Sequence, residues 1–127
     1  MPSSVKNQSF LRRLGFSLAG IGAGLRLERS FQSQALMAVG VLAFLLVLRP
    51  AAIWWALLLM NCAMVLGAEL FNTALEHTLD YLHPERHPAI KIAKDCAAGA
   101  VLIFSLGALG TFVALLLSLG PFWRRWI

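Results

Sequence analysis

The sequence predicts an all-α membrane protein in which an N-terminal amphipathic surface helix precedes three transmembrane helices. Of its 127 residues, 59% are hydrophobic and only 13% are charged, whereas an ordinary soluble domain has about 25% charged residues. A soluble chain this short could not bury so much apolar surface. Lipid or further copies of the chain must therefore cover it, and we expect a single membrane-integral domain over residues 1–127.

The first expected element is a basic, partly amphipathic segment at about residues 10–29, with arginines at both ends. Segments of this kind lie in the interface plane beside a membrane. Three apolar runs then match a hydrocarbon layer about 30 Å thick. Trp54 and Trp55 provide an interfacial anchor at the start of the second run. The predicted transmembrane spans are residues 31–48, 51–70 and 96–119.

The distribution of positive charge predicts the orientation. Five Lys and Arg residues precede the first span and three lie between the second and third, whereas Arg49 alone lies between the first and second. Because Lys and Arg favour the cytoplasmic side, we expect a cytoplasmic N-terminus and an external C-terminus, despite Arg124 and Arg125. The basic residues are scattered at the edges of apolar runs rather than gathered in one patch, so nucleic-acid binding is not expected.

All six acidic residues fall on the side predicted to be cytoplasmic. Acidic groups close to hydrocarbon are costly and are usually functional. Their one-sided placement therefore indicates where the site lies. The six residues are Glu28, Glu69, Glu76, Asp80, Glu85 and Asp95.

Four polar residues share the spacing of one helix face. Glu69, Asn72, Glu76 and Asp80 recur at intervals that match 3.6 residues per turn, on a helix that continues the second span into the cytoplasm. Two interpretations are equally open from spacing alone. The stripe provides a general base and Mg²⁺ ligands next to lipid, or it is a polar helix face against solvent or a partner.

The segment His83-Pro84-Glu85-Arg86-His87-Pro88 predicts a rigid loop, because proline fixes turns and ends helices. The histidines match no common zinc spacing, so no zinc site is expected. Lys94 could meet phosphate as a point charge. The small residues from Cys96 to Ala100 would let membrane helices approach closely.

Together these motifs carry a resemblance. The chain resembles the signature of the prokaryotic diacylglycerol kinase family at four places. These are Glu69-Leu-Phe-Asn72-Thr-Ala-Leu-Glu76, then Asp80, then His87-Pro, and then Lys94-Asp95-Cys-Ala-Ala-Gly-Ala-Val101. Glu28, two residues before Ser30-Phe31, is similar to the family's acidic residue ahead of its first span. The likeness covers about residues 10–119.

The resemblance implies an enzyme of the bacterial cytoplasmic (inner) membrane, a homotrimer whose active sites are shared between chains. Its reaction would be the Mg²⁺-dependent transfer of phosphate from ATP to diacylglycerol, giving phosphatidic acid. Undecaprenol kinase is the alternative within the family. A non-enzymatic pore or assembly subunit is the alternative outside it, but a pore would place its polar stripe within the spans.

The resemblance also implies residue roles. Glu69 would be the catalytic base on the lipid hydroxyl, with Asn72 supporting it, while Glu28 and Glu76 would bind the Mg²⁺ of MgATP. The nucleotide would be contacted by Phe16, Glu28, Glu76, Glu85, Arg86, His87, Lys94 and Asp95. The lipid would be contacted by Arg12, Arg13, Ser30, Phe31, Gln32, Ser33, Gln34, Glu69 and Ala98.

A few positions depart from the family pattern. Gln34 stands where some members have glutamate, Ala98 where some have serine, and Phe16 where some have tyrosine. An arginine that contacts substrate in the family aligns near Ser9, and Arg12 or Arg13 would replace it. These departures leave the phosphoryl-transfer residues intact and bear on the choice of lipid.

Overall fold

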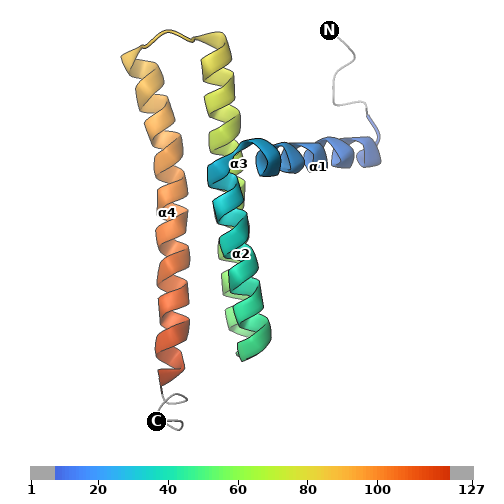
Figure 1. Ribbon diagram of the computed structural model, residues 1–127, viewed down its shortest axis with the longest axis vertical. Helices are drawn as coiled ribbons and strands as arrows, with labels where there is room; N and C mark the ends of the chain where they lie inside the picture. Colours follow the sequence, from blue (N-terminus) through green and yellow to red (C-terminus); the bar gives the residue numbers. More distant parts are fainter. Residues whose placement is uncertain (1–7, 121–127) are drawn as a thin grey trace.

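The computed structural model describes residues 8–120, which form four helices. Figure 1 shows the last three side by side as a bundle that runs alternately down, up and down, with the first helix extending sideways from it. The three bundle helices are each long and apolar enough to cross a membrane. The predicted all-α class is thereby confirmed, with three helices able to span a membrane. The helices are α1 (Phe10–Leu27), α2 (Arg29–Leu48), α3 (Ala52–Leu82) and α4 (Pro88–Ser118).

The ends of α1 and α4 follow from local chemistry. The Ser9 hydroxyl accepts a hydrogen bond from the backbone N–H of Arg12 at 3.4 Å and caps the start of α1. Pro88 opens α4, where a proline's missing N–H would have no partner in any case. The His87 ring caps the same helix by accepting from the N–H of Ala89 at 3.1 Å.

Two helices extend beyond the spans read from the sequence. α3 continues past residue 70 to Leu82, and α4 begins at Pro88 rather than near residue 96. The added turns form a hairpin that rises past the level where α1 meets α2 (Figure 1). The polar stripe therefore lies on a helix that continues the second span, as predicted.

Few apolar side chains are buried within one chain. Leu45, Leu58 and Leu115 form a buried cluster where the ends of α2 and α4 meet the start of α3. The rings of Phe44 and Phe112 pack beside it with centroids 5.2 Å apart. Most large apolar side chains on the bundle helices stay exposed, which is the pattern of helices that face lipid or other copies rather than a water-excluding core.

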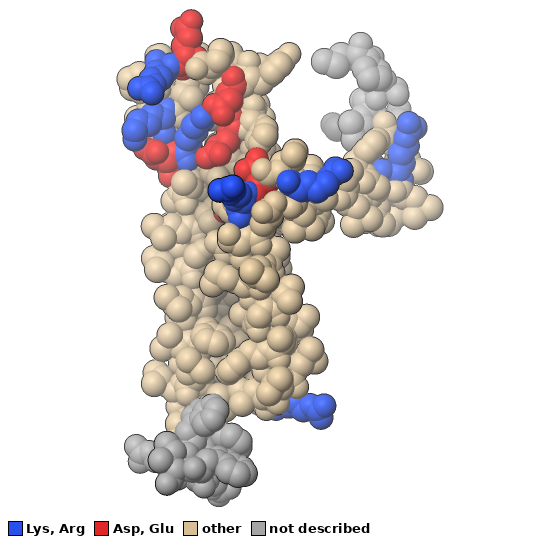
Figure 2. Space-filling model, viewed as in Figure 1, with Lys and Arg blue, Asp and Glu red and all other residues tan. Residues whose placement is uncertain are grey.

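Charged residues are segregated along the bundle. Figure 2 shows, on the face in view, a broad belt without charged side chains below the α3–α4 hairpin and the start of α2. Arg49, which follows α2, lies at the opposite end of the bundle from that hairpin. Because a charge in hydrocarbon costs several kcal/mol, the belt is the part of the bundle suited to a bilayer. Which end faces the cytoplasm remains a prediction from the sequence.

Gly24 lets α1 approach the bundle closely. It is buried at the last turn of α1, and a Cβ there would lie 2.9 Å from Leu70 Cδ2 and 3.1 Å from Phe31 Cδ1. Phe31 is only 3% exposed, so its ring has little room to withdraw. The close approach at Gly24 therefore fixes the junction of α1 and α2 against α3.

We expect Gly24→Leu to destabilise the protein by about 1–3 kcal/mol, the usual cost of overpacking, and to loosen α1 from α3. Gly22→Leu is the matched control, because a Cβ at Gly22 meets nothing within 4 Å. The measurement is the thermal unfolding midpoint in detergent micelles, with limited proteolysis of α1. Equal midpoints and equal cleavage rates for the two variants would contradict the packing described.

Candidate functional site

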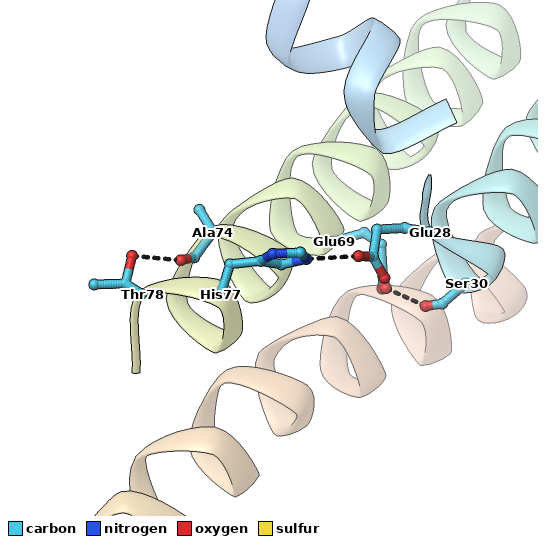
Figure 3. Close-up of polar contacts among 6 residues, drawn as sticks. All are labelled: Glu28, Ser30, Glu69, Ala74, His77 and Thr78. Carbon is cyan, nitrogen blue, oxygen red and sulfur yellow. Dashed lines mark hydrogen bonds and ion pairs between the residues drawn. The ribbon is translucent and has the colours of Figure 1, made fainter. Parts of the chain in front are cut away.

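Glu69 is a charged side chain buried in the bundle, with 4% of its surface exposed. It lies on α3, and its Oε1 accepts a hydrogen bond from Ser30 Oγ at the start of α2 (Figure 3). An isolated carboxylate in such a place would lose several kcal/mol of solvation. Within residues 8–120 the other carboxylate oxygen has no bonded partner, so it is free to accept a proton or a further hydrogen bond.

A second contact joins the same junction to α3 about two turns further on. His77 Nε2 lies 2.7 Å from Glu28 Oε1 (Figure 3). Glu28 follows α1 and precedes α2, and its backbone N–H donates to Gly24 O at 3.0 Å. The α1–α2 junction is thus attached to α3 through two side-chain pairs, Ser30 with Glu69 and Glu28 with His77.

Asn72 and Glu76 lie between these two contacts along α3, on the same helix face as Glu69. Asn72 Oδ1 is buried and has no hydrogen-bond partner in the part of the chain that the structure describes. Glu76 is partly buried and forms no ion pair within residues 8–120. Exposure increases along the stripe, from buried Glu69 to exposed Asp80. The stripe therefore runs from the bundle interior to its solvent-exposed end.

The α3–α4 hairpin is held by a charged pair. Lys94 Nζ on α4 donates to Asp80 Oδ1 on α3. On α4 itself, Lys91 pairs with Asp95 at 2.5 Å. Because His87 Nδ1 accepts the helix-capping bond, a neutral ring carries its hydrogen on Nε2 and offers a donor there. The hairpin thus presents a positioned ammonium group and an imidazole donor, beside the exposed side chains of Glu85 and Arg86.

Three residues predicted to contact the lipid make contacts within the chain, and their role toward lipid stays a prediction. Phe31 is buried at the junction. Gln32 Nε2 donates to Leu25 O at 2.9 Å, near the C-terminal end of α1. Ser33 Oγ donates to Arg29 O at 3.0 Å, within α2. In one chain, Ser30 is the member of this segment whose side chain reaches a candidate catalytic group.

The remaining predicted residues take no part in these contacts. Arg12, Arg13 and Phe16 are exposed on α1, about three to four turns before the α1–α2 junction. Gln34 lies one turn after Ser30 and lines a groove of about 460 Å³ between the bundle helices, and Ala98 is exposed on α4. Within residues 8–120 none of these five residues makes a hydrogen bond to Glu69.

A cleft of about 540 Å³ lies between α1 and α3. Glycine, alanine and larger apolar side chains make up most of its lining, and Glu28 and His77 also line it. A space with an apolar wall and a carboxylate nearby suits a ligand that is apolar over most of its length and polar at one end.

The oxygen groups at the junction fit a magnesium ion that arrives with phosphate. Mg²⁺ is usually bound by one or two carboxylates together with substrate phosphates and water. The carboxylates of Glu28 and Glu76 are ligands of this kind, and the unpartnered amide oxygen of Asn72 lies on the same face of α3 as Glu76. The described residues contain no group of three or more His, Cys, Asp or Glu side chains that could hold a metal, so a cation held by these two carboxylates would need phosphate oxygens or water as its other ligands.

Two features of the site escaped the sequence analysis. From the sequence, His77 was tested only as a zinc ligand together with the other histidines. Its contact with Glu28 could not be predicted, because the two residues are far apart in the chain. Asp80 was placed on the stripe without a partner, yet it holds Lys94. In the sequence, the one feature that could have drawn attention to His77 is that it directly follows Glu76, a predicted metal ligand.

The fold and the site define an all-helical protein with three membrane-crossing helices and a carboxylate-rich site where a transverse helix joins the bundle. Its sequence matches the family model described as prokaryotic diacylglycerol kinase over residues 15–116. The chain belongs to this family, as the resemblance indicated. The matched range includes both junction contacts and the α3–α4 hairpin.

Individual relatives carry two kinds of name. The chain is 39% identical over 87 residues to an undecaprenol kinase of Bacillus subtilis, a match that covers 68% of this chain and 71% of the relative. It is 36% identical over 106 residues to a diacylglycerol kinase of Pseudomonas aeruginosa, covering 80% and 86%. A diacylglycerol kinase of Escherichia coli K12 is 29% identical over 108 residues, covering 85% and 88%.

Proposed function

We propose that this protein is an ATP-dependent lipid kinase that phosphorylates diacylglycerol to phosphatidic acid, with Mg²⁺, at the cytoplasmic face of a bacterial inner membrane. The observation that carries the proposal is the buried Glu69 carboxylate, which has one oxygen held by Ser30 and the other free. On α3 no charged residue precedes it between Ala52 and Ala68, whereas Glu76 and Asp80 follow it. Membership in the family supports the phosphoryl-transfer chemistry.

In the proposed mechanism Glu69 takes the proton of the lipid hydroxyl as that oxygen attacks the γ-phosphorus of ATP. The new O–P bond forms while the bond from the γ-phosphorus to the β–γ bridging oxygen breaks, and ADP leaves. Ser30 donates to one oxygen of Glu69 and directs the other toward the substrate. Enzymatic phosphoryl transfer depends mainly on such positioning and on charge neutralisation.

The nucleotide rests on the solvent-exposed end of α3 and α4. Glu28 and Glu76 would hold Mg²⁺ there, which would neutralise phosphate charge, and Asn72 lies beside Glu69 in a supporting role. Lys94, fixed by Asp80, offsets further phosphate charge. The additional nucleotide contacts of the proposal are His87 through its Nε2–H, Glu85, Arg86, Asp95 and, from α1, Phe16.

The lipid enters laterally from the bilayer, and its hydroxyl reaches Glu69 at the boundary of the apolar belt. The apolar cleft between α1 and α3 accommodates part of its hydrocarbon. Arg12 and Arg13 are exposed at the start of α1, where they contact the polar end of the lipid. Gln34 and Ala98 contact the lipid from the bundle helices.

Undecaprenol is the second candidate substrate, because the relative from Bacillus subtilis that is 39% identical to this chain is named undecaprenol kinase. Both lipids present a primary hydroxyl on a long apolar body, so the same base serves either. The deciding experiment gives the purified protein radiolabelled ATP and Mg²⁺ in mixed micelles, with diacylglycerol and undecaprenol in parallel. We expect a higher kcat/KM for diacylglycerol. If only undecaprenol is labelled, undecaprenol is the substrate in place of diacylglycerol. If neither lipid is labelled, the kinase proposal is overturned.

We also propose a homotrimer with active sites between chains. The supporting observation is that one chain leaves most of its apolar bundle surface exposed and keeps Arg12, Arg13 and Phe16 away from Glu69. Neighbouring chains would cover that surface and complete each site. Glu28 and Glu76 then come from one chain and Glu69 from its neighbour.

Glu69→Gln should lower turnover by about 10²-fold or more, the usual scale of general-base catalysis, because the amide keeps the shape but accepts no proton. Nucleotide affinity should change little, since Glu69 does not contact the nucleotide in the proposed site. The measurement is kcat with equilibrium binding of a non-hydrolysable ATP analogue. Near-normal turnover would remove Glu69 from its role.

Glu28→Gln and Glu76→Gln should each weaken the use of MgATP, and added Mg²⁺ should partly restore the rate. The test is a Mg²⁺ titration of lipid phosphorylation at fixed ATP, with Glu69→Gln as the comparison whose Mg²⁺ midpoint stays that of wild type. Wild-type rates at ordinary Mg²⁺ in both variants would show that these carboxylates do not bind the metal.

Mixed oligomers test the shared site. Inactive Glu28→Gln and Glu69→Gln subunits, exchanged in micelles, should recover part of the activity if the two carboxylates of one site come from different chains. Glu28→Gln mixed with Glu76→Gln should recover none, because both changes fall on the same side of every site. Absence of recovery in every pairing, with mixed trimers verified, would contradict shared sites.

A further inference from the structure

His77 is the one residue at the junction contacts to which the proposed function gives no task. It is exposed, with 64% of its side-chain surface accessible, and the Glu28 side chain is 28% accessible. A surface pair of this kind adds little to stability. Its position is more informative, because it directly follows Glu76 on α3 and contacts the other proposed metal-binding carboxylate.

The chemistry of the two groups gives the direction of this hydrogen bond, because an ionised carboxylate only accepts hydrogen bonds. With Glu28 ionised, the hydrogen lies on His77 Nε2 and is donated to Glu28 Oε1 over 2.7 Å. The bond engages one carboxylate oxygen and leaves Oε2 for another partner. In metal sites, such outer hydrogen bonds orient the ligating group, and their loss typically costs about 10–100-fold in metal affinity or activity.

The orientation of the Glu28 side chain depends on its contact with His77. Glu28 lies between two helices with an extended backbone, and its side chain makes no capping bond to α2. Its own N–H is occupied by Gly24 O. Within residues 8–120, His77 is the side chain that holds the Glu28 carboxylate. Without that donor the carboxylate would be free to rotate away from the turn of α3 that carries Glu76.

We propose that His77 is a positioning residue, which orients the Glu28 carboxylate toward the Glu76 turn and thereby raises the affinity of the site for its divalent cation. The inference rests on the proposed function, in which these two carboxylates share Mg²⁺. His77 has no proposed contact with the nucleotide or with the reacting hydroxyl of the lipid. It acts through Glu28, so its effect appears in metal binding and disappears when Glu28 is replaced.

The direct test measures Mn²⁺ binding without turnover. The full-length protein in micelles, with a non-hydrolysable ATP analogue, is titrated with Mn²⁺, and free Mn²⁺ is followed by electron paramagnetic resonance. His77→Ala should raise the half-saturating Mn²⁺ about 10–100-fold. His77→Gln should recover much of the affinity, because its amide Nε2–H can donate from a similar position. In kinetics, His77→Ala should raise the Mg²⁺ midpoint more than it lowers kcat at saturating Mg²⁺.

Thr78→Ala is the matched control. Thr78 Oγ1 donates to Ala74 O at 2.7 Å within α3, one residue beyond His77, and does not contact Glu28 (Figure 3). Its removal should leave Mn²⁺ binding unchanged. The variant Glu28→Gln/His77→Ala should bind Mn²⁺ no more weakly than Glu28→Gln alone, because coupled residues are not additive. Additive losses would instead assign His77 an independent role and contradict the inference.

The outcomes also separate this inference from the proposed function. Wild-type-like or tighter Mn²⁺ binding in His77→Ala overturns the inference, even where lipid phosphorylation is observed. A wild-type protein that binds no Mn²⁺ overturns it too, since there is then no cation for Glu28 to hold. Mn²⁺ binding that depends on His77 and Glu28, in a protein that phosphorylates neither lipid, overturns the proposed function and supports the inference.

Discussion

A carboxylate buried between helices needs a hydrogen-bond donor, and in this protein the donor for Glu69 comes from a different helix. Ser30 reaches Glu69 because α2 begins partway along α3 rather than at its end. The start of α2 is in turn fixed by the end of α1, where Gly24 permits contact with Phe31 and Leu70. The position of the transverse helix, the register of α2 on α3 and the hydrogen bond that holds Glu69 therefore depend on one another.

α3 divides its length between two environments. Its first part packs Leu58 into the buried cluster and lies in the uncharged belt, while its last turns carry His77 and Asp80 beyond the belt. Glu69 lies at the change between them. This gradient suits a reaction between a lipid and a water-soluble nucleotide, because each reactant meets the same helix at the depth where it is soluble. The Lys94–Asp80 pair keeps α4 alongside α3 in the solvent-exposed part.

The two junction contacts have different physical settings. Ser30 and Glu69 form a part-buried hydrogen bond, and Glu69 itself is buried, so an unpaired charge there would be costly. Glu28 and His77 meet near solvent, where the same kind of bond stabilises little. A buried contact can fix the fold around a base, whereas an exposed one can orient a side chain while leaving it accessible to an ion. The division matches the roles proposed for Glu69 as the base and for Glu28 as a metal ligand that is accessible to the nucleotide.

The sequence by itself determined the helical class, the three spans and the acidic stripe, because apolar runs and a 3.6-residue period are local properties of the chain. It also located the α3–α4 loop, since Pro84 and Pro88 restrict the backbone wherever they occur. The family followed from Glu69, Asn72, Glu76 and the motif at Lys94, whose spacing is readable without coordinates. The helices run past the predicted spans, because the spans were set by the apolar runs while α3 continues to Leu82.

Only the tertiary structure decided which of these residues meet. Ser30 and Glu69 lie 39 residues apart, and Glu28 and His77 lie 49 apart; no local periodicity relates positions so distant. The register that joins them is set by the packing of Gly24 against Phe31 and Leu70, a matter of side-chain volume between three helices. For the same reason Gln32, expected at a lipid site, bonds to the end of α1. The sequence determined the helices and the chemistry they carry, and three-dimensional packing determined the pairs.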